Sequence, residues 1–297
     1  MTNRSNRIKY SPGEQVFNFV NVVFMLFMIV ITLYPMWHVL MAAFSRPALY
    51  ARHQGLLFWP AGYSLASFEA VFNNPAIWQG FRNTLIIVTC GTGINIVMTS
   101  LCAYFLSRRN QTIRNAVMFF VVFTMFFSGG MIPGWLNVQS LGMIDTLWAL
   151  MIPGAISTFN MIILRTHFQD LPAELDESAK LDGAGEFTIL VRIYLPLSSA
   201  VIAVLVLFYG VGHWNSWFSA VIYLPRARQF HPLQVVLRTV LIQNEVRDYN
   251  TGGSDVEQIA ETIKYAVIVV ATAPILMLYP FLQKYFVKGV MIGAIKG

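Results

Sequence analysis

Charged residues are scarce in this chain of 297 residues: Asp, Glu, Lys and Arg make up 11% of it, whereas hydrophobic residues make up 56%. A soluble domain usually carries about 25% charged residues. The composition therefore excludes an ordinary soluble protein, although the length alone would allow one or two globular domains. We also find no internal repeat and no low-complexity segment.

Six runs of the chain lack charged residues entirely: Val16–Ser45, Asn83–Ser107, Asn115–Ile144, Thr146–Leu164, Ile193–Pro225 and Tyr265–Gln283. All are near or above the roughly 20 residues that a helix needs to cross a bilayer. The runs predict an all-α, polytopic membrane protein with a single transmembrane domain over residues 1–297. We expect its six spans at approximately 16–45, 83–107, 115–130, 146–165, 196–224 and 263–284. The first run is too long for the hydrophobic region of a signal peptide, which favours a retained anchor.

Several kinds of chemical site are missing. The chain has no GxxxxGK[ST] phosphate-binding loop, so any ATP must be hydrolysed on another polypeptide. No span holds a central charged residue of the kind that relays ions or protons, which counts against a secondary transporter. The five histidines are scattered, and Cys90 and Cys102 suit neither a zinc site nor a redox pair. We therefore expect that this chain is not an enzyme and that it binds no metal or cofactor.

The basic residues report the orientation of the chain in the membrane. If the N-terminus is cytoplasmic and the six spans alternate, more than half of the 20 Lys and Arg residues fall in inside segments. This bias is the positive-inside rule. The net charge of +6 is therefore a topology signal rather than the mark of a nucleic-acid partner, and both termini are predicted to be cytoplasmic.

One polar segment, residues 170–195, interrupts this hydrophobic chain. Asp170 is expected to cap a short helix with Pro172 in its first turn. Gly183-Ala184-Gly185 should end that helix, and a second short helix is expected over Glu186–Tyr194 before a membrane span that starts near Pro196. The pattern predicts two helices joined by a glycine elbow at the cytoplasmic face.

The first of these helices has a small, nearly neutral face. Leu175, Ser178 and Ala179 share it at three- and four-residue spacing, so another surface could approach it closely. The alternative is an ordinary solvated loop, which explains the charges but not a capped, sharply bent helix pair. We therefore favour a docking surface.

A polar and aromatic cluster, YGVGHWNSWF, lies inside the fifth predicted span. At 100° per residue, Tyr209, Gly212, His213 and Ser216 fall on one face, and the tryptophans share a neighbouring face. Sugars are bound by aromatic platforms with amide and hydroxyl groups, so a sugar path is one interpretation. The alternative is an aromatic belt at the membrane surface with small residues for helix packing. The candidate path residues are Asn160, Tyr209, His213, Trp214, Asn215, Ser216 and Trp217.

The polar segment resembles the coupling motif of binding-protein-dependent ABC importers, a Glu-Ala-Ala triplet, a glycine and a later Ile-x-Leu-Pro. The residues that match its spacing are Glu177, Ser178, Ala179, Gly183, Ile193, Leu195 and Pro196, with serine in place of the middle alanine. The stretches "FSGGMIPGW", "IILRTHFQDLP", "GHWNSWF" and "YFVKGVMIGAIKG" are similar to the carbohydrate branch, in particular its oligo- and polysaccharide type. The resemblance covers most of the chain from about Asn83 onward.

The resemblance implies a permease subunit in a bacterial cytoplasmic membrane, with a type I importer fold. The implied partners are a second related permease, two ATPase subunits that bind ATP and Mg, and an extracytoplasmic binding protein that delivers an oligo- or polysaccharide. The residues implied to dock on the ATPase are Glu177, Ser178, Ala179, Asp182, Gly183 and Pro196.

The resemblance also implies that the C-terminal segment, with Gly289, Gly293 and Lys296, reaches the ATPase dimer. A frayed chain end is the alternative for that segment. For the whole chain, the alternatives are an energy-independent sugar channel or facilitator, a permease for another solute, and a scaffold protein with a degenerate copy of the motif.

Overall fold

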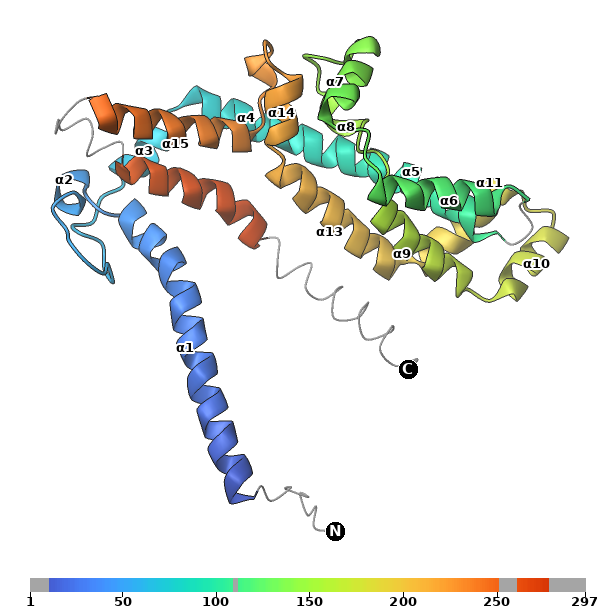
Figure 1. The fold of residues 1–297 in the computed structure, drawn as a ribbon, viewed down its shortest axis with the longest axis horizontal. Helices are drawn as coiled ribbons and strands as arrows, with labels where there is room; N and C mark the ends of the chain where they lie inside the picture. The colour runs from blue at the N-terminus through green and yellow to red at the C-terminus, as the bar shows by residue number, and fades with distance from the viewer. Residues whose placement is uncertain (1–10, 109–111, 251–260, 278–297) are drawn as a thin grey trace. The chain divides into compact units, whose positions relative to one another are not determined.

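The computed structural model describes residues 11–108, 112–250 and 261–277. These residues are helical, with no β-strand assigned among them (Figure 1), so the all-α prediction is confirmed. The chain divides into two compact units, residues 1–71 with 244–269 and residues 72–243 with 270–297. The single transmembrane domain remains a prediction.

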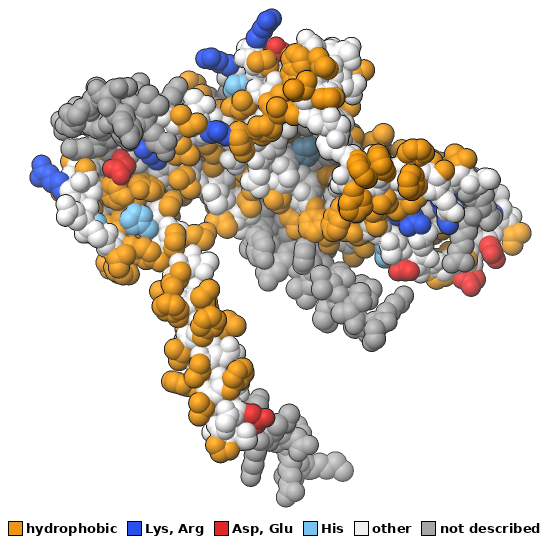
Figure 2. All heavy atoms as spheres, in the orientation of Figure 1, with side chains coloured by type: hydrophobic (Ala, Val, Ile, Leu, Met, Phe, Trp, Pro, Cys, Tyr) orange, Lys and Arg blue, Asp and Glu red, His pale blue; other side chains and the backbone are white. Residues whose placement is uncertain are grey.

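Helix α1 (Pro12–Ala43) contains most of the predicted first span. It begins at Pro12 because Ser11 and Glu14 form a capping box, in which the Glu14 amide donates to Ser11 Oγ (3.3 Å) and the Ser11 amide donates to Glu14 Oε2 (2.6 Å). The helix continues through Pro35, so the proline does not end it. Apolar side chains are exposed along α1 (Figure 2), as contact with lipid requires.

The segment between the first and second predicted spans contains short helices, α2 (Pro47–Tyr50) and α3 (Ala66–Phe72). Within the first unit, the Tyr50 hydroxyl donates to the Tyr265 hydroxyl at 3.0 Å. Tyr265 belongs to a helix over residues 261–277, which is the described part of the predicted sixth span. The hydrogen bond therefore fastens the segment after α1 to the last described helix.

The second unit begins with one continuous helix of 33 residues, built from α4 (Pro75–Ile86), the π-helical turn η1 (Ile87–Gly91) and α5 (Thr92–Ser107). It starts before the predicted second span, 83–107, because Asn74 Oδ1 accepts a backbone N–H at 3.0 Å and a proline takes the first helical position. The π-helical turn inside it is a rare feature that is frequent at functional sites.

The third predicted span, 115–130, corresponds to α6 (Arg114–Phe126), which ends before a glycine pair. Gly130 there has a φ of +88°. The chain then bends by 120° into α7 (Met131–Ser140). Pro133 lies in the first turn of α7, where a proline costs no hydrogen bond.

The predicted fourth span, 146–165, is not one helix. The short helix α8 (Trp148–Met151) stops before Pro153. Helix α9 (Thr158–Gln169) starts afterwards with Ser157 as its N-cap. The proline and the glycine that follows it break the helix between them.

The predicted fifth span, 196–224, is also divided. The helices from Glu186 onward are, in chain order, α11 (Glu186–Ile189), the π-helical turn η2 (Leu190–Tyr194), α12 (Leu195–Leu197), α13 (Ser199–Asn215), α14 (Phe218–Tyr223), η3 (Arg228–Phe230) and α15 (Leu233–Asn250). The chain bends by 85° between α12 and α13. The long apolar helix therefore starts at Ser199, after the bend, rather than at Pro196.

Two helices of the described residues are long and apolar enough to cross a membrane, α1 and Pro75–Ser107. The number rises to four if each strongly bent pair counts as one span. Six spans therefore remain a prediction. The apolar helices agree with the predicted membrane class.

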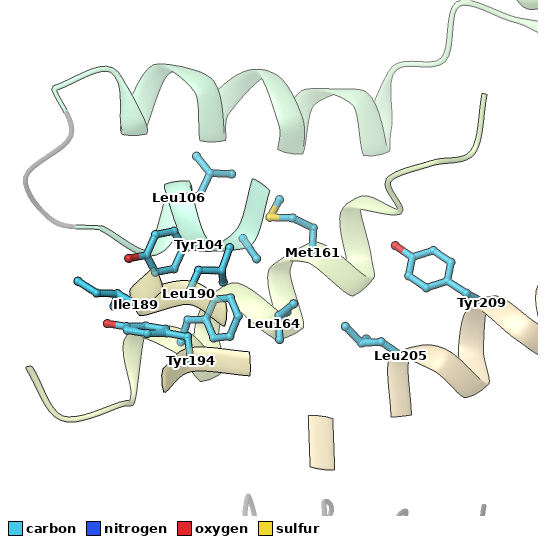
Figure 3. Close-up of a cluster of buried hydrophobic side chains, with 11 residues drawn as sticks. Tyr104, Leu106, Met161, Leu164, Ile189, Leu190, Tyr194, Leu205 and Tyr209 are labelled. Carbon is cyan, nitrogen blue, oxygen red and sulfur yellow. The ribbon is translucent and has the colours of Figure 1, made fainter. Parts of the chain in front are cut away.

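The core of the second unit lies where α5, α9, α11 with η2, and α13 pack together (Figure 3). Its buried members are Ala103, Tyr104, Leu106, Met161, Leu164, Phe168, Ile189, Leu190, Tyr194, Leu205 and Tyr209. Helix α9 leads into the polar segment, and the pair α11–η2 forms its last part. The polar segment is thus anchored on a packed core at each end.

Candidate functional site

The polar segment folds as two short helices, α10 (Ala173–Leu181) and α11, with Gly183 between them. Gly183 has a φ of +79°, a conformation that glycine adopts without steric cost. Backbone bonds close the turn, because the Gly183 amide donates to Lys180 O (3.0 Å) and the Ala184 amide donates to Ala179 O (2.9 Å). The glycine therefore sets the direction in which α11 leaves α10.

The predicted cap of α10 is wrong. Asp170 is instead the C-terminal cap of α9, and its amide donates to the carbonyl oxygens of Thr166 and His167, both at 3.2 Å. Pro172 occupies the N-cap position of α10 and no side chain caps that helix. The reason is that α9 continues to Gln169, past the predicted end of the fourth span.

Helix α10 has an inner and an outer face. Asp176 is only 16% exposed, and Ala179 is half-buried against the core. Glu177 and Ser178 are exposed. The face predicted for Leu175, Ser178 and Ala179 is therefore split, because Ala179 packs inward.

Four charged side chains form a closed ring of alternating sign, which we call the charge ring. Arg108, at the end of α5, contacts Asp176 of α10 (Nη1 to Oδ1, 2.6 Å) and Glu186 of α11 (Nη2 to Oε2, 2.7 Å). Lys180 closes the ring at 3.1 Å from Asp176 Oδ2 and 3.1 Å from Glu186 Oε1. One arginine thus holds both short helices.

Two tyrosines surround Arg108. Tyr104 donates to Glu186 Oε2 at 2.6 Å and also contacts Arg108, and Tyr194 Oη accepts from Arg108 Nη1 at 3.3 Å. The guanidinium carbon lies 4.3 Å from the centroid of the Tyr104 ring and 5.1 Å from that of Tyr194. Both distances are in the cation–π range. With its side chain 13% exposed, Arg108 is enclosed between core aromatics and carboxylates.

The contacts within the charge ring stabilise the charged forms of Arg108, Glu186 and Lys180. Burial alone would lower the pKa of Arg108, but hydrogen bonds to Asp176 and Tyr104 outweigh it and raise the pKa above its ordinary value. Burial would raise the pKa of Glu186, but hydrogen bonds from Tyr104 and Lys180 lower it below its usual value. Hydrogen bonds to Asp176 and Glu186 raise the pKa of Lys180. Arg108, Glu186 and Lys180 therefore stay charged at neutral pH.

Sequence reasoning missed the charge ring. The spacing of Asp176 and Lys180, four residues apart in a helix, was a readable signal for one of its ion pairs. Arg108 lies 78 residues before Glu186, and no local pattern connects the two.

Two large apolar side chains are exposed beside the charged residues at this end of the second unit. Leu181, the last residue of α10, is 89% exposed, and Phe187 of α11 is 70% exposed. The end that carries α10 and α11 in Figure 1 bears blue and red side chains in Figure 2.

The remaining predicted docking residues lie around this surface. Asp182 is the exposed C-terminal cap of α10, and Pro196 is exposed in α12. Gly289, Gly293 and Lys296 lie outside the described residues.

The polar residues predicted for a substrate path take part in neutral hydrogen bonds between helices. The hydroxyl of Tyr209 lies 2.7 Å from Thr99 Oγ1 of α5 and accepts the Ser157 amide at 3.0 Å. His213 Nε2 lies 2.7 Å from Asn95 Oδ1 of α5. In this conformation both side chains join α13 to its neighbours.

Asn95 is the centre of this arrangement, and sequence reasoning missed it. It is fully buried, and its Nδ2 donates to Gly154 O (2.7 Å) and Ala155 O (3.0 Å) at the break between α8 and α9. A Cβ placed on Gly91 would lie 2.7 Å from His213 Nε2, so the π-helical turn η1 packs its glycine directly against the imidazole. We call Asn95, Thr99, Tyr209 and His213 the neutral network.

The aromatic residues of the predicted cluster have different surroundings. Trp214 is buried and meets Phe81 edge to face with ring centroids 6.0 Å apart. Trp217 is half-buried, and the guanidinium of Arg238 stacks over its ring at 3.7 Å. Trp214 therefore packs between helices, whereas Trp217 supports an exposed arginine.

The helical face predicted through Ser216 is broken, because α13 ends at Asn215 and the backbone of Ser216 is extended. Asn215 is exposed and Ser216 is half-buried. Asn160 is buried near the start of α9, where its amide donates to Ser157 Oγ at 3.5 Å.

Residues 95–292 match the family described as "Binding-protein-dependent transport system inner membrane component". Two proteins of Bacillus subtilis (strain 168) are similar over almost the full chain. The polygalacturonan/rhamnogalacturonan transport system permease protein YtcP is 41% identical over 96% of this chain and 99% of its own. Protein LplC is 42% identical over 97% of both chains.

A solved structure has the same fold. The crystal structure of a bacterial ABC transporter involved in the import of the acidic polysaccharide alginate contains a chain with a TM-score of 0.85 and 29% identity. The match covers 94% of this chain and 100% of that one. The all-α fold is therefore that of an ABC importer permease.

These findings confirm the predicted family and do not favour an energy-independent channel. The match covers two thirds of the chain, and the identity to full-length permeases exceeds 40%. The chain belongs to the binding-protein-dependent transport system inner membrane components and is a permease subunit of such a system.

Proposed function

We propose that this chain is one of two permease subunits of an ATP-driven importer for acidic oligo- or polysaccharides. Its partners would be a related second permease, two ATPase subunits that carry ATP and Mg, and an extracytoplasmic solute-binding protein. The proposal rests mainly on the exposed surface formed by α10 and α11. An ATPase subunit could dock on this surface, whereas a simple channel would have no need of it.

The docking surface would consist of the outer face of α10 and the elbow. Glu177 and Ser178 are exposed on it, and Leu181 and Phe187 extend from it as apolar anchors. Burial of one large apolar side chain stabilises a complex by about 1.5–3 kcal/mol. The split face of α10 supports this use, because its inner face binds Arg108 and leaves the outer face free for a partner.

The orientation follows from the charge bias. The docking surface and both termini would be cytoplasmic, in the inner membrane of a bacterium. The C-terminal residues Gly289, Gly293 and Lys296 would add a second contact with the ATPases.

The substrate would be acidic. One relative is named for polygalacturonan and rhamnogalacturonan, and the structural neighbour belongs to an importer of the acidic polysaccharide alginate. On the proposed external side, Arg226, Arg228 and Arg238 are exposed and form no ion pair with a described side chain. Guanidinium groups bind carboxylates in a bidentate manner. Unpaired external arginines are therefore suited to receive uronate units.

The substrate path would run beside the end of α13. Asn215 is exposed there, Ser216 and Trp217 are half-buried, and Trp217 offers an aromatic platform next to Arg238. Tyr209, His213, Trp214 and Asn160 are more enclosed. They would line the path only after the helices around the neutral network separate.

The substrate assignment can be tested by uptake. Cells that lack the gene should fail to take up fluorescent galacturonan oligomers, while uptake of neutral malto-oligosaccharides continues. Depletion of ATP should abolish the same uptake in complemented cells. Uptake that survives ATP depletion would support a facilitator, and equal loss of both sugars would contradict the acidic substrate.

Docking can be tested on the purified complex. Glu177→Lys should raise the dissociation constant of the permease for the ATPase subunits by about tenfold, and so lower their retention, because one unpaired charge in an interface costs about 1.4 kcal/mol or more. Glu69→Lys is the matched control, since Glu69 is also exposed but lies on the proposed external side. Equal retention in both variants would overturn the docking assignment.

A further inference from the structure

Arg108 is the one side chain of the charge ring that does not belong to the polar segment. It follows α5 directly, whereas Asp176 and Lys180 are on α10 and Glu186 begins α11. The ring thus joins three elements through a single guanidinium. Fork-shaped arginine is the side chain best suited to hold two carboxylates in fixed directions.

The surroundings of Arg108 make this joint stiff. Its side chain is 13% exposed, and the rings of Tyr104 and Tyr194 flank the guanidinium. Both tyrosines are buried members of the core. The Arg108–Asp176 contact is protected from water and salt, whereas Glu186 and Lys180 are 58% and 46% exposed.

We propose that Arg108 is a positioning residue that makes α5, α10 and α11 move as one body. Displacement of the docking surface by the ATPases would then pass directly into the long helix Pro75–Ser107 instead of being absorbed at the Gly183 elbow. This role rests on the proposed function, because it needs α10 and α11 to dock on an ATPase.

Through α5, Arg108 also connects the docking surface to the neutral network. Helix α5 carries Asn95 and Thr99, the partners of His213 and Tyr209 in the neutral network. A movement of α5 at Arg108 therefore acts on the hydrogen bonds that hold α13 and the α8–α9 break. Arg108 binds no substrate in this scheme and acts through the helix that it follows.

The test measures the distance between α5 and α10 in the purified importer. Spin labels are placed on Val97 of α5, which is 57% exposed, and on the exposed Ala173 of α10, after Cys90 and Cys102 are replaced by serine. With Arg108 present, the distance distribution should be narrow and should keep its peak between the nucleotide-free and the ATP–vanadate states. In Arg108→Gln the distribution should be at least twice as broad.

The same variant should lower ATP hydrolysis stimulated by loaded binding protein by about tenfold, a factor within the usual range of coupling between two sites. Arg108→Lys keeps the positive charge but not the fork that holds two carboxylates, so its distribution should be narrower than that of Arg108→Gln and broader than that of the unmodified protein. Arg192→Gln is the matched control, because Arg192 is an exposed arginine of the same predicted side without an ion pair to a described residue. It should behave like the unmodified protein.

Where Arg108→Gln does not fold, Glu186→Gln removes one arm of the ring without burying a lone charge, and it should broaden the distribution partially. A narrow distribution in Arg108→Gln, or in Glu186→Gln where only that variant folds, overturns the proposal. If the unmodified permease retains no ATPase, docking itself is overturned, and the width of the distribution in the permease alone still shows whether Arg108 joins the helices.

Discussion

The charge ring and the neutral network both fasten α5 to its neighbours, but they use opposite chemistry. Arg108 meets two carboxylates at the end of the helix, where two of the four ring members are about half exposed. Asn95, fully buried thirteen positions earlier, forms only neutral hydrogen bonds. A charge is costly to hold within a bilayer, whereas an amide with satisfied partners is tolerated.

The charge ring and the neutral network therefore suit different roles. Ion pairs with Arg108 are directional and act over several ångströms, so they suit a joint that must transmit force. Hydrogen bonds between membrane helices are weak, averaging about 0.6 kcal/mol. The neutral network can therefore open and close at small cost.

The largest effect is expected from a substitution at the Gly183 elbow, which should disturb the charge ring and leave the neutral network unchanged. Gly183→Pro should abolish most substrate-stimulated ATP hydrolysis, because proline requires a φ near −65° where the backbone has +79°. The change would move α11, and with it Glu186, away from Arg108. The neutral network should remain intact, so permease yield should change little.

Gly185→Ala provides the matched control for the elbow. Gly185 has a φ of −74°, and an added Cβ would meet no atom within 4 Å. Hydrolysis in this variant should stay near that of the unmodified importer. If Gly183→Pro is equally active, the angle at the elbow is irrelevant to coupling.

Asn95→Leu attacks the neutral network at its centre. It should lower the free energy of unfolding by about 1–3 kcal/mol, because two carbonyl oxygens and an imidazole lose their buried partner. Thermal unfolding in detergent measures the loss, which should be independent of salt. Asn215→Leu, at an exposed site, should leave the stability unchanged. A strong salt dependence of the Asn95→Leu effect would contradict the neutral character of the network.

Tyr209→Phe removes a single hydroxyl from the same network and should cost about 1 kcal/mol. The hydroxyl lies 2.7 Å from Thr99 Oγ1 and accepts the Ser157 amide. Thermal unfolding again gives the measurement. Tyr223→Phe serves as the control, since that half-buried hydroxyl has no hydrogen bond to a described residue. Equal unfolding temperatures for the two variants would remove Tyr209 from the network.

The smallest expected effect is the pH dependence of the charge ring. The pKa of Glu186 is lowered, so its contribution to stability is present above the ordinary value of about 4.3 and is lost as the pH falls through the lowered value. The pKa of Lys180 is raised, so its contribution is present below about 10.4 and is lost as the pH rises through the raised value.

Unfolding temperatures measured from pH 3 to 6 should show the acid limb, which should disappear in Glu186→Gln. Both side chains are about half exposed, so solvent screening keeps the effect small. An acid limb of the same size in Glu186→Gln would assign it to other carboxylates.

Local sequence patterns predicted much of the fold. Charge-free runs located the apolar helices, and Gly183 located the end of α10. The predictions failed where a helix end depends on its neighbours. Asp170 was expected to start α10, but α9 continued to it, and the helix expected up to Ser216 stopped at Asn215.

The candidate site shows the same limit. Glu177, Ser178 and Gly183 could be selected from spacing because the motif is contiguous. Arg108 and Asn95 could not, because their partners lie 78 and 118 residues away in the chain. A polar residue in a long apolar run gives no sign of which other helix it will meet.

The sequence by itself determined that this chain is a helical membrane permease with a bent polar segment between two apolar regions. The length of each hydrophobic run, the positions of the glycines and the distribution of basic residues can be read along the chain. They do not depend on how the helices pack. Only the tertiary structure decided that Arg108 closes a ring with Asp176, Lys180 and Glu186, and that Asn95 supports His213. Such contacts depend on the angle and register at which helices cross, and these are fixed by side-chain packing across the whole core.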